Sequence, residues 1–411
     1  MTLASALDPS QGGAERGSQH GGSPDFLEVE AGLGERDRLL GDPFGYRSGM
    51  EEVGVSFDAS LIVDLSRNLS GGAGRAGTFR HLFDASLTFD LNTLAGIEGA
   101  TVFLDFQTQE GQDGSGETGD LQAFSNIDEA DVTALYEFWY EQVFADGAFR
   151  VKLGKVDANS EFAFVEHGGE FIHSSAGFSP TLFVLPTYPD PALSASLHAL
   201  LGEGWSVSAG LYDGAAQEGV RTGRRGFGSA FGSPADLFLI AEVSRAWGDG
   251  DAVAAGEVLP GRVAAGVWYH TGAFDRFDGG VASGTGGFYL TADQLLVDLG
   301  EGRGVGAFFQ YGYADDDVSE VAHHLGAGVQ WYGPVVSRPD DVAGVMVSWA
   351  GLSGEPGAGF SESDETAVEL FYKAQLTPWL SLKPDVQYIV GPGGGGLDDA
   401  WVFTLRMELT F

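Results

Sequence analysis

The stretch of the chain richest in side chains that could bind a small polar solute is residues 157–191. Its polar groups are carboxylates, an amide, imidazoles and a phenol, at Asp157, Asn159, Glu161, Glu166, His167, Glu170, His173, Tyr188 and Asp190. Aromatic rings lie between them, at Phe162, Phe164, Phe171 and Phe178. Planar polar groups hydrogen-bond to hydroxyls and aromatic faces pack on C–H surfaces, so this mixture suits a sugar. The alternative is that the phenylalanines anchor the segment to a wall and the acids are merely solvated.

Basic side chains form a second pattern. Strand alternation directs six of them to the polar face of their strands, at Arg80, Arg150, Lys152, Lys373, Lys383 and Arg406. If those strands close into a barrel, the six lie on one arc of its interior. Acids facing them from the 157–191 segment would then create a transverse field across a constriction. The alternative is pairing with carboxylates on the wall such as Asp385, Glu369 and Glu408, and both arrangements could hold at once.

The elements that must position these residues are β-strands. In residues 400–411 every second side chain, from Trp401 to Phe411, is large and apolar, whereas those between, such as Arg406 and Glu408, are polar. Successive side chains of a strand point to opposite faces, so one face suits lipid and the other water. The pattern recurs along the chain, as it must in a membrane β-barrel.

Sixteen strands are predicted, most near the ~9–11 residues that a tilted membrane strand needs. They span 55–66, 79–91, 98–108, 132–143, 148–156, 192–201, 204–213, 235–247, 260–271, 284–298, 303–314, 321–332, 342–350, 364–376, 379–391 and 400–411. Odd-numbered connections such as 109–131 and 157–191 are mostly long, and even-numbered ones such as 202–203 are mostly short; 248–259 is an exception. This asymmetry is typical of outer-membrane barrels. A loop as long as 157–191 is usually functional, and we expect it to fold inward and narrow the pore.

Composition excludes several classes of protein. The net charge is −38, from 59 acids and 21 bases, so nucleic acid is not expected as a partner. There is no cysteine, hence no disulfide framework or thiolate metal site. The 64 glycines lack a Gly-X-Y period, so the chain is not collagen-like. No apolar run has the length of a transmembrane helix. A soluble β-protein, with fewer strands and no such loop asymmetry, remains the structural alternative.

No catalytic, metal or cofactor site is predicted. His173, Ser174 and Ser175 are adjacent in sequence, so their side chains would not converge as a nucleophile and base do, and there is no Gly-x-Ser-x-Gly elbow. His323 and His324 point to opposite faces of one strand, and no third ligand is spaced for a metal. Gly393–Gly396 is a turn, because no Lys-Ser/Thr follows it as in a phosphate loop.

Several stretches together resemble a known family. They are Asp37–Arg47 with Glu51–Val55, Leu135–Glu141, Gly154–Ala163, Phe171–Pro180 and Pro186–Ala192. These resemble the carbohydrate-selective porins of the OprB type, over roughly residues 37–411 and most strongly over 135–213. One departure is Pro43-Phe44, where a Trp-Gly pair is expected.

The resemblance implies a sixteen-stranded antiparallel transmembrane barrel, often a homotrimer, through which glucose and related sugars diffuse. Lipopolysaccharide and other outer-membrane lipids would surround it. An ion-selective or general porin with the same barrel is the alternative function. Residues 1–36 are polar and Gly-rich, and we expect them to form a flexible segment ahead of a barrel over 37–411. An outer-membrane protein should carry a signal peptide, and none is visible at Met1.

Overall fold

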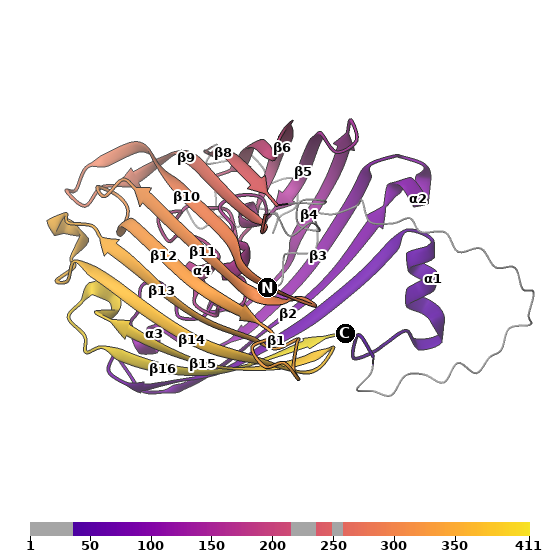
Figure 1. Cartoon of the computed structure of the whole chain (residues 1–411). Coiled ribbons are helices and arrows are strands. Elements are labelled where there is room, and N and C mark those ends of the chain that lie inside the picture. The colour runs from indigo at the N-terminus through magenta and orange to yellow at the C-terminus, as the bar shows by residue number, and fades with distance from the viewer. Residues whose placement is uncertain (1–35, 215–235, 249–257) are drawn as a thin grey trace, which may run out of the picture.

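The computed structural model describes residues 36–214, 236–248 and 258–411, and sixteen antiparallel strands dominate them. They are β1 (Val55–Ser70), β2 (Gly77–Asp90), β3 (Ala100–Gly111), β4 (Val132–Phe144), β5 (Phe149–Val156), β6 (Ala192–Gly202), β7 (Trp205–Asp213), β8 (Leu237–Trp247), β9 (Gly261–Asp275), β10 (Val281–Gly300), β11 (Arg303–Ala314), β12 (Val321–Tyr332), β13 (Val342–Leu352), β14 (Asp364–Thr377), β15 (Leu380–Val390) and β16 (Ala400–Thr410). Each strand pairs with the next in sequence, and β1 pairs with β16, so the sheet is a closed barrel (Figure 1).

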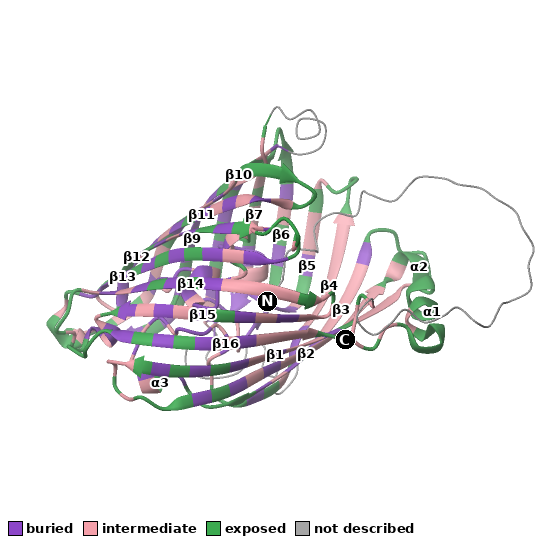
Figure 2. Ribbon diagram, turned by 60° about the horizontal axis from the view of Figure 1, so that its bottom comes forward, coloured by how far each residue is buried: buried purple, intermediate pink, exposed green. Residues whose placement is uncertain are grey.

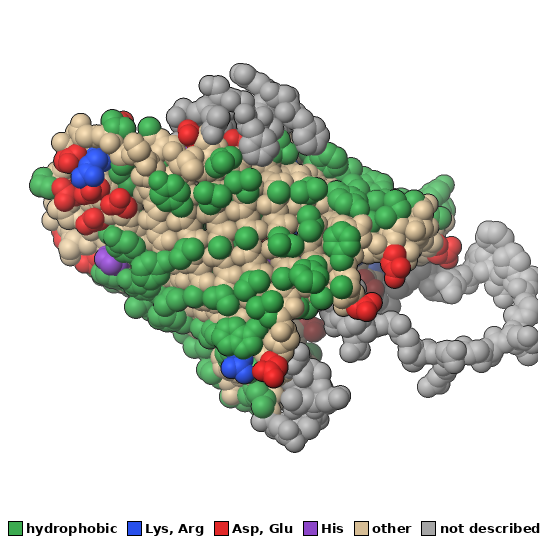
Figure 3. Space-filling view, turned by 90° about the horizontal axis from the view of Figure 1, so that it is seen from above, with side chains coloured by type: hydrophobic (Ala, Val, Ile, Leu, Met, Phe, Trp, Pro, Cys, Tyr) green, Lys and Arg blue, Asp and Glu red, His purple; other side chains and the backbone are tan. Residues whose placement is uncertain are grey.

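The barrel has an apolar exterior and a polar interior. On β16, Trp401 and Phe403 are exposed on the outer face, whereas Thr404 and Arg406 are buried inside. Buried and exposed residues therefore alternate along the strands (Figure 2). Apolar side chains form rows over the outer wall, and charged side chains gather toward its ends (Figure 3). This is the surface that a bilayer requires of a spanning barrel.

Short helices lie at both ends of the barrel and in its loops. At the end that holds the C-terminus, α1 (Tyr46–Glu52) follows η2 (Pro43–Gly45), and α2 (Leu91–Ala95) joins β2 to β3 (Figure 1). The loops contain α3 (Ser115–Thr118), η3 (Ala158–Ser160), η4 (Glu166–Gly168), α4 (Ser174–Gly177), η7 (Pro356–Ala358) and η8 (Pro392–Gly394). Among the described residues, no helix has both the length and the apolarity needed to cross a membrane.

The predicted sixteen-stranded barrel is confirmed, and each predicted strand coincides with an observed one whose ends differ by at most four residues. Two odd-numbered connections are much shorter than predicted, because their hairpins continue pairing further out. The β1–β2 connection is 71–76, and that between β9 and β10 is 276–280. The predicted flexible segment lies outside the described residues except for Arg36, as do most of the predicted connections 214–234 and 248–259.

A β-bulge in β4 turns two successive side chains into the barrel. The β3–β4 ladder shifts register between Asp105 and Phe106, which pair with Glu137 and Leu135. Tyr136 is the extra residue of this bulge, and both Tyr136 and Glu137 are buried. A bulge breaks the strict alternation of a strand, so two successive side chains can turn inward. Both then contact the beginning of the 157–191 loop.

Candidate functional site

The 157–191 loop folds into the barrel, as predicted, and its first turn is fixed by the bulge on β4. The Asp157 carboxylate accepts hydrogen bonds from the Tyr136 hydroxyl and, at 2.8 Å, from the Asn159 backbone N–H. The Asp157 N–H in turn donates to Glu137 Oε1 at 2.8 Å. Asp157 thus caps η3 and is itself buried. The loop leaves β5 in one defined direction, because its first residue is held from both sides.

A first charge cluster ties the loop to β4, β5 and β6. Glu161 accepts from Arg150 Nη2 at 2.6 Å and from the Lys152 ammonium, and it lies 2.6 Å from His198 Nε2. Glu141 on β4 is 3.0 Å from Arg150 and 3.5 Å from Lys152. Two acids are therefore shared by two bases. Arg150 and Glu141 keep part of their surface toward the lumen, whereas Glu161 and Lys152 are buried.

A second charge cluster ties the middle of the loop to β14, β15 and β16. Glu170 lies 2.9 Å from both Lys373 Nζ and Lys383 Nζ. Glu408 lies 2.9 Å from Lys373 and 3.0 Å from Lys383, which makes a square of alternating charge. Lys383 also donates to the Glu170 backbone carbonyl at 2.8 Å. Only Glu170 in this square comes from the loop.

Electrostatics favour the charged form of both loop acids. Burial alone would raise the pKa of Glu161, but Lys152, His198 and Arg150 outweigh burial and hold that pKa well below its usual range. Burial likewise opposes ionisation of Glu170, yet Lys383 and Lys373 lower its pKa to about 2. Both acids are anions at neutral pH, so the clusters act as fixed ionic attachments of the loop.

Carboxylates on the wall also hold the loop through its backbone. Glu369 on β14 accepts from the N–H groups of Ile172 at 2.7 Å and His173 at 2.9 Å. Further along the wall, Glu242 accepts from the Ala163 N–H at 3.1 Å, and Asp293 accepts from the His167 N–H at 2.9 Å. A loop inside a barrel cannot satisfy its amides by pairing with a sheet, so these acceptors replace the missing ladder.

Apolar contacts complete the attachment. Phe162 and Phe171 are buried in two separate clusters against the barrel wall. The Phe171 ring meets Phe371 edge-on at 5.0 Å and Phe308 at 5.7 Å. Phe164 is only partly buried, and its ring lies 4.3 Å from the Arg262 guanidinium. Phe162 and Phe171 therefore anchor the loop to the wall, whereas the ring of Phe164 keeps some exposed surface.

The 112–131 loop also enters the barrel, which the sequence did not predict. Glu365 on β14 accepts from the N–H groups of Leu121 at 2.8 Å and Gln122 at 3.0 Å. It accepts a third bond from the Gly393 N–H at 2.6 Å, which belongs to the β15–β16 connection. One buried carboxylate therefore joins two loops. The sequence feature that could have predicted this contact is Glu365 itself, an acid on the polar face of a strand with no base nearby.

Buried arginines attach the 112–131 loop to the strands at the β1–β16 seam. Arg406 makes two bonds of 2.8 Å to Asp64 and donates to Asn126 Oδ1 at 2.9 Å. Arg80 pairs with Asp128 of the loop at 2.7 Å. The two loops then meet directly, because the Asn126 N–H donates to the Ile172 carbonyl at 2.7 Å. The lumen is narrowed by two loops that are bonded to each other and to the wall.

The residues predicted from sequence divide into two groups by exposure. Buried ones are Asp157, Glu161, His173, Arg80, Lys152, Lys383 and Arg406. Those that keep some exposed surface are Asn159, Glu166, Tyr188, Asp190, Arg150 and Lys373. The basic residues pair with acids of the two loops and of the wall. Sequence reasoning missed Asp64, Asp128, Glu242, Asp293 and Glu365, whose roles depend on contacts distant in the chain.

The geometry offers little for chemistry on a substrate. His173 Nδ1 accepts from the Ser175 backbone N–H at 3.2 Å, and burial lowers the pKa of His173 to about 3. Within the described ranges, the acids and histidines grouped closely enough for a metal are Asp315, Asp316 and Asp317, in the loop between β11 and β12. One of these acids, Asp317, already pairs at 2.6 Å with Arg276 of the connection between β9 and β10.

Residues 76–411 match the family described as carbohydrate-selective porin, OprB family. "Putative porin QuiX" of Acinetobacter baylyi is 26% identical over 92% of this chain and 94% of its own length. "Porin B" of Pseudomonas aeruginosa is 24% identical over 91% of each chain. The high-pH structure of Pseudomonas putida OprB has a TM-score of 0.82 at 20% identity, covering 92% of this chain and 99% of that one. The low-pH structure of the same protein has a TM-score of 0.61.

A closed barrel with an apolar outer wall, a charged lumen and loops folded inward is an outer-membrane porin, that is, a channel. The chain belongs to the carbohydrate-selective porin family, OprB.

Proposed function

We propose that the chain passes mono- and small oligosaccharides by passive, selective diffusion, and that the space left beside the two inserted loops is its selective part. The observation that carries the proposal is the set of lumen charges that are paired yet not fully enclosed. Arg150 and Glu141 on one wall, Lys373 and Glu408 on another, and Glu170 of the loop each keep some exposed side chain. Sugar hydroxyls can exchange water for these planar and charged groups, weakly enough to leave again.

We propose different roles for the predicted site residues. Asn159, Glu166, Tyr188, Asp190, Arg150 and Lys373, which retain exposed surface, are proposed to contact the solute. Asp157, Glu161, His173, Arg80, Lys152, Lys383 and Arg406 are buried, and they are proposed to position the loops and their charges. The same loop carries the partly exposed ring of Phe164 and the exposed carboxylate of Glu166, and aromatic and carboxylate groups are the mixture that sugars bind.

Channel current measured while sugars are titrated tests the proposal. A sugar that binds in the constriction should block ion current in a saturable way, and different sugars should differ in half-blocking concentration. Liposome swelling with sugars and amino acids of matched size is the second measurement. High conductance that no sugar blocks, together with equal swelling rates, would instead identify the alternative, a general or ion-selective porin.

The family resemblance also supports a homotrimer, embedded in outer-membrane lipid. The mass of the protein–detergent complex, measured by light scattering with the detergent contribution subtracted, tests this. A protein mass near 43.2 kDa, that of one chain, would contradict the trimer.

A further inference from the structure

Arg67 lies on the outside of the barrel and, among the described residues, has no acid paired with it. Arg67 belongs to β1, where Ser66 and Asn68 are buried inside and Leu65 and Leu69 are 51% and 53% exposed outside. Arg67 is exposed and shares the outer face with these leucines. It stands three residues before Ser70, the end of β1, so it is about 10 Å from that end. The long odd-numbered connections lie at this end of the strands, and in outer-membrane barrels such connections are extracellular, so Arg67 lies on the side of the outer leaflet.

The neighbours of Arg67 offer it no counter-charge. Its cross-strand partners are Phe403 on β16 and Gly77 on β2. Among the described residues, the Arg67 side chain has no ion pair or hydrogen bond, and the same holds for the side chain of Arg75 in the 71–76 connection of the same hairpin. By contrast, Arg276, in the connection between β9 and β10, pairs with Asp317 at 2.6 Å. A guanidinium near the end of a membrane strand snorkels to the interface, where the phosphates of lipid headgroups are the anions within reach.

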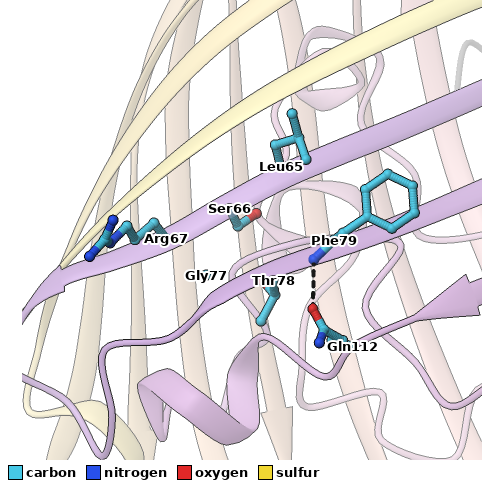
Figure 4. A pocket seen from close by; sticks show the side chains of 7 residues that line it. All are labelled: Leu65, Ser66, Arg67, Gly77, Thr78, Phe79 and Gln112. Atoms are coloured by element: carbon cyan, nitrogen blue, oxygen red, sulfur yellow. Dashed lines mark hydrogen bonds between the residues drawn. The ribbon is translucent and has the colours of Figure 1, made fainter.

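A hollow in the outer wall lies beside Arg67 (Figure 4). It has a volume of about 340 Å³, and Leu65, Arg67, Gly77, Phe79 and Gln112 are among its lining residues. The hollow exists because β3 ends at Gly111, which pairs with Arg80, so the first residues of β2 have no β3 neighbour. Gln112 instead accepts from the Phe79 N–H at 3.1 Å, and Gly77 has no side chain to fill the space.

We propose that this hollow binds a phosphorylated lipid of the outer leaflet, of the lipid A type. The phosphate pairs with the Arg67 guanidinium, with Arg75 above it on the hairpin, while an acyl chain lies over Leu65 and Phe79. Arginine is suited to this role because its planar fork binds phosphate with two parallel bonds. The apolar lining is continuous with the lipid-facing wall, which favours a lipid over a soluble anion.

Native mass spectrometry of the full chain in neutral detergent, titrated with lipid A, tests the proposal. Three ligands distinguish the phosphate contact from the acyl-chain contact. They are lipid A, the same lipid with both phosphates removed, and inorganic phosphate as a competitor. The variants are Arg67→Gln, Arg67→Lys and the matched control Arg276→Gln. The control removes the same positive charge, but at an arginine that already pairs with Asp278 and Asp317. We expect the apparent Kd for lipid A to rise about five- to tenfold in Arg67→Gln. Arg67→Lys should retain most of the binding, and Arg276→Gln should resemble the wild type.

Several results would overturn the proposal. They are equal weakening in Arg67→Gln and Arg276→Gln, equal binding of the dephosphorylated lipid, displacement by millimolar phosphate, or a change of oligomeric state in Arg67→Gln in place of lost lipid. Sugar block of the channel should be unchanged in Arg67→Gln, because the side chain lies outside the lumen. The lipid site and the proposed sugar transport can therefore fail independently.

Discussion

Glu170 is a single carboxylate on which the position of the 157–191 loop depends. It contributes one corner of the square formed with Glu408, Lys373 and Lys383, and the other three corners belong to the barrel wall. Removing a wall corner changes the charge of the lumen but leaves the loop attached. Removing the loop corner changes the charge by the same amount and also breaks the attachment. The two effects can therefore be separated experimentally.

We expect Glu170→Gln to lower the sugar affinity of the channel and to make it noisier, because the loop loses its ionic bond to Lys373 and Lys383. Losing one partner of a largely buried pair costs roughly 1–3 kcal/mol once partial exposure is allowed for. Single-channel recording with sugar titration is the measurement. The matched control is Glu408→Gln, which removes the same charge beside the same lysines but not the loop contact; equal noise in both variants would contradict this role.

Acid should weaken the attachment of the 157–191 loop. The folded pKa of His173 is lowered to about 3 by burial, and that of Glu170 to about 2 by its lysines. A group with a lowered folded pKa stabilises the docked loop above its ordinary pKa and loses this as pH falls toward the folded value. The loss therefore begins below about 6.5 for His173 and below about 4.5 for Glu170.

A cysteine label reports this pH dependence, since the chain has none of its own. Introduced at exposed Glu166, it should become more mobile in spin-label spectra between pH 6.5 and 3. His173→Asn should abolish the upper part of the transition, because the titrating imidazole is gone. A label whose mobility is constant from pH 7 to pH 3 would rule out this mechanism. The same label on the exposed Asp58, at the other end of the barrel, is the control.

At the scale of elements, strands were predictable and loop destinations were not. The alternation of Trp401, Phe403 and Leu405 with polar residues is local, so it fixed the faces of β16 from the sequence alone. The bulge at Tyr136 has no such local signature, since its backbone shift appears only in the pairing with β3. The inward course of residues 112–131 likewise depends on Asp64, Glu365 and Arg406, which are distant in sequence.

Within the candidate site, the alternation of side chains along a strand correctly predicted that residues such as Arg80 and Lys152 point into the lumen. It could not predict how deeply these side chains are buried. These side chains become buried only when both loops fold against the wall, and the alternation of side chains along a strand carries no information about the loops. The sugar-contacting role of the remaining residues stays a prediction.

The Glu365 carboxylate should control how firmly the 112–131 loop is held. It accepts three backbone N–H groups, from Leu121, Gln122 and Gly393. Glutamine at this position has one acceptor oxygen and an amide that donates, so at least one buried N–H loses its partner, at about 1–3 kcal/mol. We expect Glu365→Gln to raise single-channel conductance by loosening the loop.

Glu362→Gln is the control for Glu365→Gln. It removes the same charge, but from an exposed residue in the neighbouring connection. Conductance should remain at the wild-type value in this variant. If both substitutions alter conductance equally, net charge and not loop attachment is responsible.

For the whole molecule, charge is distributed unequally between membrane wall and water. The chain has a net charge of −38, and on the outer wall of its described part apolar side chains prevail while charged ones gather toward the ends (Figure 3). The lumen bases are neutralised by acids, in the two charge clusters and in the pairs Arg80–Asp128 and Arg406–Asp64, which leaves the excess of carboxylates to set the field at the mouths of the pore. Such a field concentrates cations and depletes anions near a pore.

The channel should therefore prefer cations, and the preference should fall as salt rises. The Debye length is about 10 Å at 0.1 M and about 3 Å at 1 M, so salt screens the mouths far more effectively than it screens the paired charges inside. Reversal potentials across a tenfold KCl gradient, centred on low and on high salt, measure this. The concentration of a neutral sugar that halves the current should change little over the same range, because hydroxyl contacts carry no net charge. Anion preference at low salt would contradict the argument, and a sugar affinity that falls in parallel with cation preference would show that mouth electrostatics also governs sugar binding.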